Sequence, residues 1–409
     1  AVVSSGLFGS VSGSAIANVV TTGQITIPMM KKIGYRPSFA GAVEAVASTG
    51  GQIMPPVMGA AVFIMSDFTG IPYIEIVKHA ILPALLYYIS VFFMVHFEAL
   101  KSDLGAITDS RQSLKYLLIN SYLLLPLVVI VVILIKGYSP TFACLISMVL
   151  VLIVASIKKE TRMGIKEIAN ALIEGAKGTL SVAMACACAG IIVGIVNYTG
   201  LGFKFTSLLL SLADTSMLLV LVMTALATMI LGMGLPTTPA YVVVASLMVP
   251  TLVRLEVPLI AAHLFAFYFA NIANITPPVA LASYTAAGIA DSDPMKTGLE
   301  AFRLGIAAYI VPFIFVFSPS LLLIDVEAFE LIWTIISAII GVVFLASAAE
   351  GWLKTRLSIL ERVLLLIASI SLIYPGLYTD AIGLVCGVVV IVHQIVKAKT
   401  EAHGCEIFE

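Results

Sequence analysis

The sequence predicts an all-α polytopic membrane protein with an inverted repeat, in which each half contributes one re-entrant hairpin and one broken helix. Of the 409 residues, 60% are hydrophobic and only 11% are charged, and the mean hydropathy is +1.10, far outside the range of soluble domains. The segment Gln52–Val57 recurs 222 residues later as Asn274–Val279, and each copy carries Pro-Pro inside a long apolar stretch. The net charge of −1 provides no basic field for nucleic acid, so the lipid bilayer is the expected surroundings.

Each Pro-Pro step is expected to break a membrane helix. Proline has no amide donor and forces the preceding residue away from α geometry. Because unpaired backbone groups are costly in hydrocarbon, such a break persists only where it lines a cavity or holds an ion. Two breaks at matching places in two halves indicate a binding site near the bilayer midplane of a secondary transporter. A packing kink without further role is the alternative interpretation.

Ten apolar stretches have roughly the length needed to cross a bilayer. They are residues 39–66, 76–97, 117–135, 139–157, 178–197, 259–289, 303–323, 330–349, 361–374 and 379–396. We expect four parts: a first repeat unit (1–98), connecting and scaffold helices (99–197), a second repeat unit (198–323) and C-terminal extra membrane helices (324–409).

Residues 217–253 have the pattern of a re-entrant hairpin. Two apolar arms, 217–231 and 240–253, flank a break at Gly232–Pro239. An arm of about 15 residues covers only about 22 Å, which is short of the hydrocarbon core of about 30 Å. The start of the chain has the same pattern, with Ser12–Asn18 as the tip and 19–30 as the returning arm. The alternatives are an ordinary extracellular loop for the former and a close contact of small residues for the latter.

Basic residues suggest which ends of the helices face the cytoplasm. If the loop Lys31–Arg36 is cytoplasmic, all lysines and arginines but four (Lys78, Lys136, Lys204 and Arg254) fall on the cytoplasmic side. Five crossings then separate the two units, which are therefore inverted relative to one another, so that the hairpins approach the midplane from opposite sides.

The tips and breaks offer hard oxygen ligands and helix ends, which suit a monovalent cation such as Na⁺ and an anionic substrate. The first predicted cation site comprises Ser12, Gly13, Ser14, Gln52 and Pro55, and the second comprises Gly232, Gly234, Thr238, Asn274, Thr276 and Pro277. The predicted substrate-binding residues are Ser14, Asn18, Pro236, Thr237 and Thr238. No catalytic residue and no organic cofactor is expected, with Na⁺ as the coupling ion.

Two titratable residues in apolar stretches have open roles. Glu44 is either a proton site or a carboxylate that reaches the interface or pairs with Arg36, and the second interpretation is favoured. His263 is expected to be an interfacial histidine with satisfied hydrogen bonds. The five cysteines lie mostly in apolar stretches and show no zinc spacing.

Several long motifs resemble the large membrane subunit of TRAP transporters, specifically the fused permeases of the TAXI type. They are Ser12–Asn18, Gly34–Pro37, Ala47–Ala60, Leu231–Thr238 and Ile275–Ala280. The resemblance covers most of the chain and is densest over 6–98 and 190–320. It implies an elevator-type, Na⁺-coupled importer of small organic acids in the inner (cytoplasmic) membrane, which receives substrate from an extracytoplasmic TAXI-type solute-binding protein. It also implies that this chain lacks N-terminal helices, including those equivalent to the small subunit.

Three functions are alternatives to Na⁺-coupled import. The same fold could couple to protons, but the proposed sites have no deep Asp or Glu. An ion channel would not need two hairpins that meet from opposite sides. An intramembrane hydrolase with Ser12 or Ser14 as nucleophile would need a base at matching depth, and His263 is the candidate.

Overall fold

The computed structural model describes residues 1–105, 120–159, 161–201, 204, 207, 216–324, 326–374 and 376–406. Within these residues the regular structure is helical, apart from one isolated bridge between Trp352 and Arg356. Six of the described helical segments are long and apolar enough to cross a membrane. The all-α polytopic fold class is therefore confirmed.

The two repeat units contain corresponding helices. The first unit consists of α1 (Val2–Ser12), α2 (Ala15–Ile33), α3 (Pro37–Gly51), α4 (Ala61–Thr69) and α5 (Tyr73–Lys101). The second unit consists of α11 (Met217–Gly232), α12 (Thr237–Arg254), α13 (Leu259–Ile272), η2 (Ala273–Ile275), α14 (Leu281–Ala290), α15 (Pro294–Leu304) and α16 (Ile306–Phe317). The sequence offset of 222 holds in the structure, since it separates the first residues of α2 and α12, and likewise those of α3 and α13.

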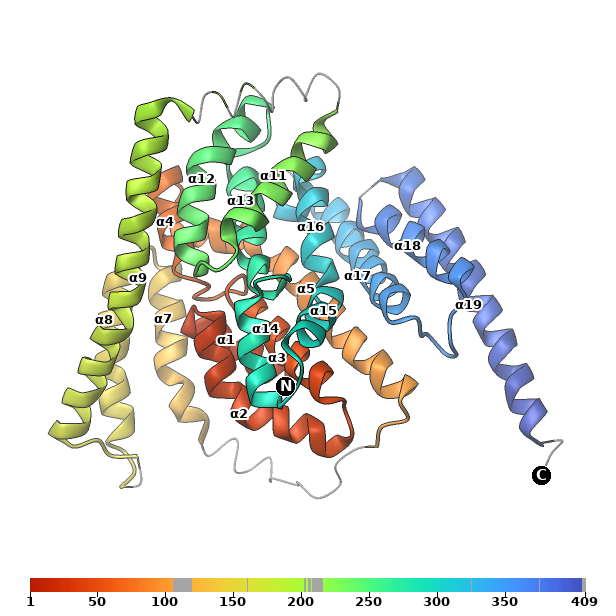
Figure 1. Ribbon diagram of the computed structural model, residues 1–409, viewed down its shortest axis with the longest axis horizontal. Coiled ribbons are helices and arrows are strands. Elements are labelled where there is room, and N and C mark those ends of the chain that lie inside the picture. Colours follow the sequence, from red (N-terminus) through yellow and green to blue (C-terminus); the bar gives the residue numbers. More distant parts are fainter. Residues whose placement is uncertain are drawn as a thin grey trace.

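The remaining helices lie on either side of the repeat units (Figure 1). Between the units run η1 (Ser121–Leu124), α7 (Leu125–Ile135), α8 (Pro140–Ala155) and α9 (Ile165–Thr199). After them come η3 (Pro319–Leu322), α17 (Ala328–Glu350), α18 (Ile359–Ile373) and α19 (Leu377–Glu406). α17 packs against α5 and α18, whereas α9 packs against α12.

Helix-ending residues create each hairpin tip. In the first hairpin Gly13 ends α1 in the left-handed region (φ 66°), and the Ser14 side chain caps α2 by accepting from the amide of Ala17. In the second hairpin Gly234 has φ 76° and Pro236 precedes the first residue of α12. The prediction that Asn18 lies in the first tip is wrong, because the Ser14 cap starts the helix earlier and places Asn18 in the first turn of α2.

Both Pro-Pro steps break a helix, as predicted. α3 ends at Gly51 and α4 begins nine residues beyond Gln52, while α13 and η2 end before Thr276 and α14 begins at Leu281. The Pro55–Pro56 and Pro277–Pro278 peptide bonds are both cis.

The second segment of each broken helix packs on the opposite repeat unit. α14 packs against α2 and α3 of the first unit, and α4 packs against α12 and α13 of the second unit. Figure 1 shows the α1–α2 hairpin in the lower half of the molecule and the α11–α12 hairpin in the upper half. The two units are thus interlocked, and their hairpins approach the centre from opposite ends.

A network of ion pairs joins four helix ends at one end of the molecule. Glu98 on α5 and Glu300 on α15 both pair with Arg36, which precedes α3, at 3.0 and 3.3 Å. Glu350 at the end of α17 pairs with Lys101 at 2.8 Å and with Arg303 at 3.1 Å. The predicted topology assigns all three basic residues to the cytoplasmic side, and the network places them together.

Candidate functional site

In the second unit, the hairpin tip lies directly on the helix break. The Asn274 amide nitrogen Nδ2 donates to Thr237 Oγ1 at 3.0 Å and to the Asn271 carbonyl at 3.1 Å. A Cβ atom added to Gly232 would lie 3.1 Å from Ala273 Cβ, so only glycine permits this approach without displacement. The structure therefore brings Gly232 and Thr237 of the tip together with Asn274 of the break.

Thr276 occupies the unwound segment and is held from two sides. Its hydroxyl donates to the Ile272 carbonyl at 2.7 Å and lies 2.7 Å from the Tyr309 hydroxyl of α16. Asn274 and Thr276 are both buried. Thr238 is buried beside Thr237 in the first turn of α12, whereas Pro236 and Gly234 are exposed and Pro277 is half-buried. The second site thus has buried polar side chains at the break and exposed residues at the hairpin tip.

In the first unit, the hairpin tip also lies against the helix break, and the contacts are between backbone atoms. A Cβ atom added to Gly13 would lie 3.5 Å from the carbonyl oxygen of Met58, and one added to Gly51 would lie 2.5 Å from the Cα of Gly9. Gln52 is buried, and its carbonyl accepts from the Gly59 amide at 2.7 Å. These contacts bring α1, α3 and the segment after the Pro-Pro step together.

The side chains around the first tip are arranged differently from those around the second. Ser12 and Ser14 are exposed, and Ser12 Oγ donates to the Ser14 carbonyl at 3.4 Å. Asn18 is fully buried, and its Nδ2 donates to the Ser5 carbonyl at 2.7 Å. Asn18 therefore ties the two arms of the hairpin together, and its predicted contact with substrate stays a prediction. Pro55 is half-buried at the break.

The two breaks contact one another at the centre of the repeat. Asn271 Nδ2 donates to the Thr49 carbonyl at 2.9 Å, and these two residues are 222 positions apart in the sequence. Residues related by a two-fold axis contact each other only when they lie close to it. The Asn271 Oδ1 and Thr49 Oγ1 atoms are buried and have no hydrogen-bond partner in the described part of the chain. The two sites are thus joined at a pseudo-two-fold axis.

Tyrosines anchor the carbonyls that the breaks release. The Tyr73 hydroxyl donates to the carbonyls of Pro56 and Val57 at 2.9 and 2.5 Å. The Tyr284 hydroxyl donates to the carbonyl of Pro278 at 2.6 Å. Pro56 and Pro278 are equivalent in the repeat but the two tyrosines are not, so the sequence offset could not reveal this support. The apolar stretches around these tyrosines gave no signal of it either.

Four helix ends of alternating polarity meet at each site. α1 and α3 end at the first site and α11 and α13 end at the second, and each of these helices directs its negative end there. α2, α4, α12 and α14 begin at the sites and contribute positive ends. Each site can therefore stabilise a cation at the carbonyl ends and an anionic group at the amide ends.

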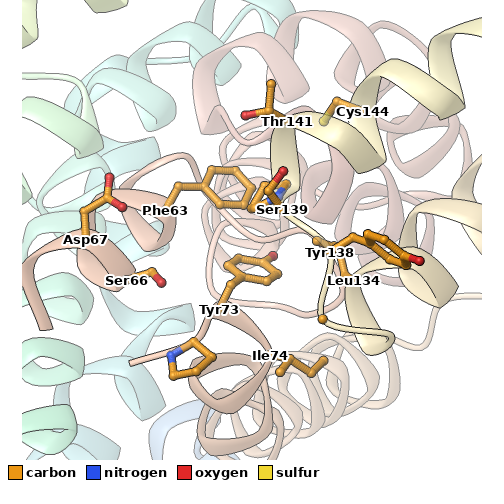
Figure 2. A pocket seen from close by; sticks show the side chains of 13 residues that line it. Phe63, Ser66, Asp67, Tyr73, Ile74, Leu134, Tyr138, Ser139, Thr141 and Cys144 are labelled. Carbon is orange, nitrogen blue, oxygen red and sulfur yellow. The ribbon is translucent and has the colours of Figure 1, made fainter. Parts of the chain in front are cut away.

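A cavity of about 560 Å³ is lined by Tyr73, whose hydroxyl donates to the Pro56 carbonyl at the first break (Figure 2). It is bounded by α4, the start of α5 and the connection between α7 and α8. Phe63 stacks on Tyr73 with ring centroids 4.9 Å apart, and the polar lining includes Ser66, Asp67 and Thr141. Because the exposed Asp67 carboxylate repels anions, this cavity does not suit an organic acid as a resting place.

The comparisons with known proteins identify the family. Residues 1–328 match the model described as "Tripartite ATP-independent periplasmic transporter, DctM component". The chain belongs to this family of TRAP transporter large permease subunits. Residues 331–385 match a second model, a domain of unknown function (DUF3394).

Three TRAP permeases are similar to the chain over most of their length. A putative TRAP transporter large permease protein of Haemophilus influenzae is 24% identical over 80% of this chain and 77% of its own. The 2,3-diketo-L-gulonate TRAP transporter large permease protein YiaN of Escherichia coli is 22% identical over 78% and 75%, respectively. The sialic acid TRAP transporter large permease protein SiaM of Vibrio cholerae is 23% identical over 71% and 68%.

Membership of the TRAP family decides several predictions. TRAP large permeases are multi-pass proteins of the inner membrane that work with an extracytoplasmic solute-binding protein and a small subunit, and the family consists of transporters, not enzymes. The hydrolase alternative also has no geometric support, because His263 Nδ1 lies 2.7 Å from the Tyr241 hydroxyl in the second unit, away from the Ser12 and Ser14 tip.

The favoured interpretation of Glu44 in this TRAP permease is wrong. Its carboxylate does not reach the interface but is fully buried in α3. Arg36 pairs with Glu98 and Glu300 instead, because it precedes the first turn of α3, where the ends of α5 and α15 converge.

Proposed function

We propose that this TRAP permease is the membrane subunit of a Na⁺-coupled importer of small organic acids. The observation that carries the proposal is the convergence, at both Pro-Pro breaks, of helix C-terminal ends with hydroxyl and amide groups. Monovalent cations prefer such hard oxygen ligands, and no acidic side chain is required to hold Na⁺. In the second unit these groups are Thr237, Asn274 and Thr276, which are all buried.

The same sites provide for an anionic substrate. The first turns of α2 and α12 point their amide ends toward the tips, and Ser14, Thr237 and Thr238 add hydroxyl groups there. The relatives named for 2,3-diketo-L-gulonate and sialic acid transport substrates that carry a carboxylate, which supports an organic acid as the substrate class. We propose an elevator mechanism in which the interlocked hairpins and broken helices move together, and a TAXI-type binding protein as the donor of substrate.

The deciding experiment is uptake into proteoliposomes that contain the permease, its small subunit and the cognate binding protein. Candidate acids are offered with a Na⁺ gradient, with a K⁺ gradient of equal size and without binding protein. Uptake that requires both Na⁺ and the binding protein supports the proposal. Saturable uptake that is unchanged when K⁺ replaces Na⁺ would refute Na⁺ coupling, and flux that does not saturate would indicate a channel.

A further inference from the structure

Glu44 is surrounded by hydroxyl groups from three helices. Its Oε1 accepts from Thr22 of α2 at 2.5 Å and from Ser48 of α3 at 3.1 Å. Its Oε2 accepts from Ser5 of α1 at 2.7 Å and from Thr26 of α2 at 2.5 Å. Each carboxylate oxygen thus has two donors, which is the arrangement that an ionised carboxylate prefers.

Among the described residues, no basic group lies within ion-pair distance of this carboxylate. The helices packed around it carry, within them or at their ends, these other titratable or charged groups: the Ala1 amine, Lys31, Lys32, Arg36, Tyr73, Glu75, Lys78, His79, Tyr87, Tyr88, His96, Glu98, Lys101, Tyr284, Asp291, Asp293, Lys296, Glu300 and Arg303. Of these, Lys31 donates to the Ala290 carbonyl, Tyr88 donates to the Ala47 carbonyl and Arg36 is ion-paired. An unpaired buried charge in a membrane protein is costly and is a functional candidate by default.

We propose that Glu44 is a proton-binding site whose occupancy sets how firmly the α1–α2 hairpin is held to α3. The proposal rests on the transport function proposed above and adds a proton to its ligands. A proton from water binds one carboxylate oxygen, which then donates a hydrogen bond in place of accepting one. The charge-assisted bonds from the hydroxyls of α1 and α2 are replaced by weaker neutral ones, so the hairpin is held less firmly.

Thr22 is the residue through which the proton enters and the hydrogen bonds rearrange. It is the one half-buried member of the cluster, whereas Ser5, Thr26, Glu44 and Ser48 are buried. The Thr22 hydroxyl can turn its hydrogen toward the Asn18 carbonyl at 2.9 Å and accept from the protonated carboxyl.

The change at Thr22 also reaches the tip of the hairpin. Thr22 Oγ1 lies 3.2 Å from Asn18 Oδ1, and Asn18 Nδ2 ties α2 to the Ser5 carbonyl of α1. The proton site is thereby linked to the first turn of α2, where Ser14 caps the helix at the predicted cation site.

Infrared difference spectroscopy of the purified complete transporter tests the site without Na⁺ or substrate. In acidic buffer we expect a component of the carboxylic C=O stretching band that is lost in Glu44→Gln. The matched control Glu75→Gln, which removes a partly exposed carboxylate of α5 that pairs with Lys78, should keep this component. A Glu44→Gln protein whose band is identical to that of the wild type would overturn the proposal.

Uptake as a function of pH supplies the second measurement. Glu44→Gln should keep Na⁺-driven uptake and lose the pH dependence that this carboxylate confers. Thr26→Val removes one donor to the ionised carboxylate, so the midpoint of the band and of uptake should move upward relative to the wild type. An unmoved midpoint in Thr26→Val overturns the proposal, even if Glu44→Gln fails to fold. If wild-type uptake proves independent of Na⁺, Na⁺ coupling fails while the infrared result still decides the role of Glu44.

Discussion

Replacing Asn274 with alanine should weaken the second cation site by a measurable amount. The substitution removes hydrogen bonds from Nδ2 to Thr237 Oγ1 at 3.0 Å and to the Asn271 carbonyl at 3.1 Å. Only the bond to Thr237 joins the tip to the break, and it is worth about 1 kcal/mol net. Because the cation needs this contact, the half-saturating Na⁺ concentration should rise by about fivefold.

The assay is uptake of a labelled substrate acid into proteoliposomes at fixed membrane potential over a range of Na⁺ concentrations. Ser246→Ala on α12 serves as the control, because its hydroxyl donates only within the helix, to the Val242 carbonyl at 2.9 Å. It should leave the Na⁺ dependence unchanged. If Asn274→Ala lowers the maximal rate but leaves the half-saturating Na⁺ concentration at its wild-type value, Asn274 supports the fold and not the cation site.

Three further substitutions examine the tips and breaks by uptake and thermal unfolding. Gly51→Ala places Cβ 2.5 Å from the backbone of Gly9 and should lower the free energy of unfolding by about 1–3 kcal/mol. The control Gly288→Ala, whose Cβ would have nothing within 4 Å, should change it little. Equal unfolding temperatures for the two variants would contradict the close packing of Gly51 on Gly9. Gly234→Val forces a side chain into φ 76°, which costs about 1–2 kcal/mol, and should reduce uptake; normal transport would show that the tip is only a loop. Thr276→Ala should raise the Na⁺ requirement more than Thr276→Ser, which keeps a hydroxyl, and identical requirements would remove Thr276 from the site.

The breaks and hairpins were predictable because they depend on local backbone chemistry. Proline ends a helix wherever it removes a donor, so Pro55 and Pro277 indicated the breaks without knowledge of the surroundings. The predicted first arm is short, since α11 has 16 residues and ends at Gly232. The prediction that the second arm is too short to span a membrane is wrong, because α12 has 18 residues and is long and apolar enough to cross. Because equivalent residues are 222 positions apart, a break or tip found in one unit predicted the corresponding position in the other.

The side-chain partners could not be predicted, because they come from distant elements. Tyr309 meets Thr276 across 33 residues, and no spacing rule connects α16 to the unwound segment. The Glu44 cluster has a recognisable pattern in the sequence. Thr22 and Thr26, and likewise Glu44 and Ser48, are four residues apart and therefore share one face of a helix. Polar pairs at this spacing inside an apolar helix indicate a buried polar contact.

The interlocking of the two units bears on how the sites can move. α4 packs on α12 and α13 while α14 packs on α2 and α3, so neither hairpin can shift without displacing part of the other unit. The hydrogen bond from Asn271 to the Thr49 carbonyl joins the breaks directly at the axis. Two sites fastened in this way change position together more readily than separately, which is the condition that an elevator mechanism places on its moving body. The ion pairs of Arg36 with Glu98 and Glu300 connect the start of α3 to the end of α5 and to α15. Any displacement of α3 relative to α5 must therefore break the ion pair between Arg36 and Glu98.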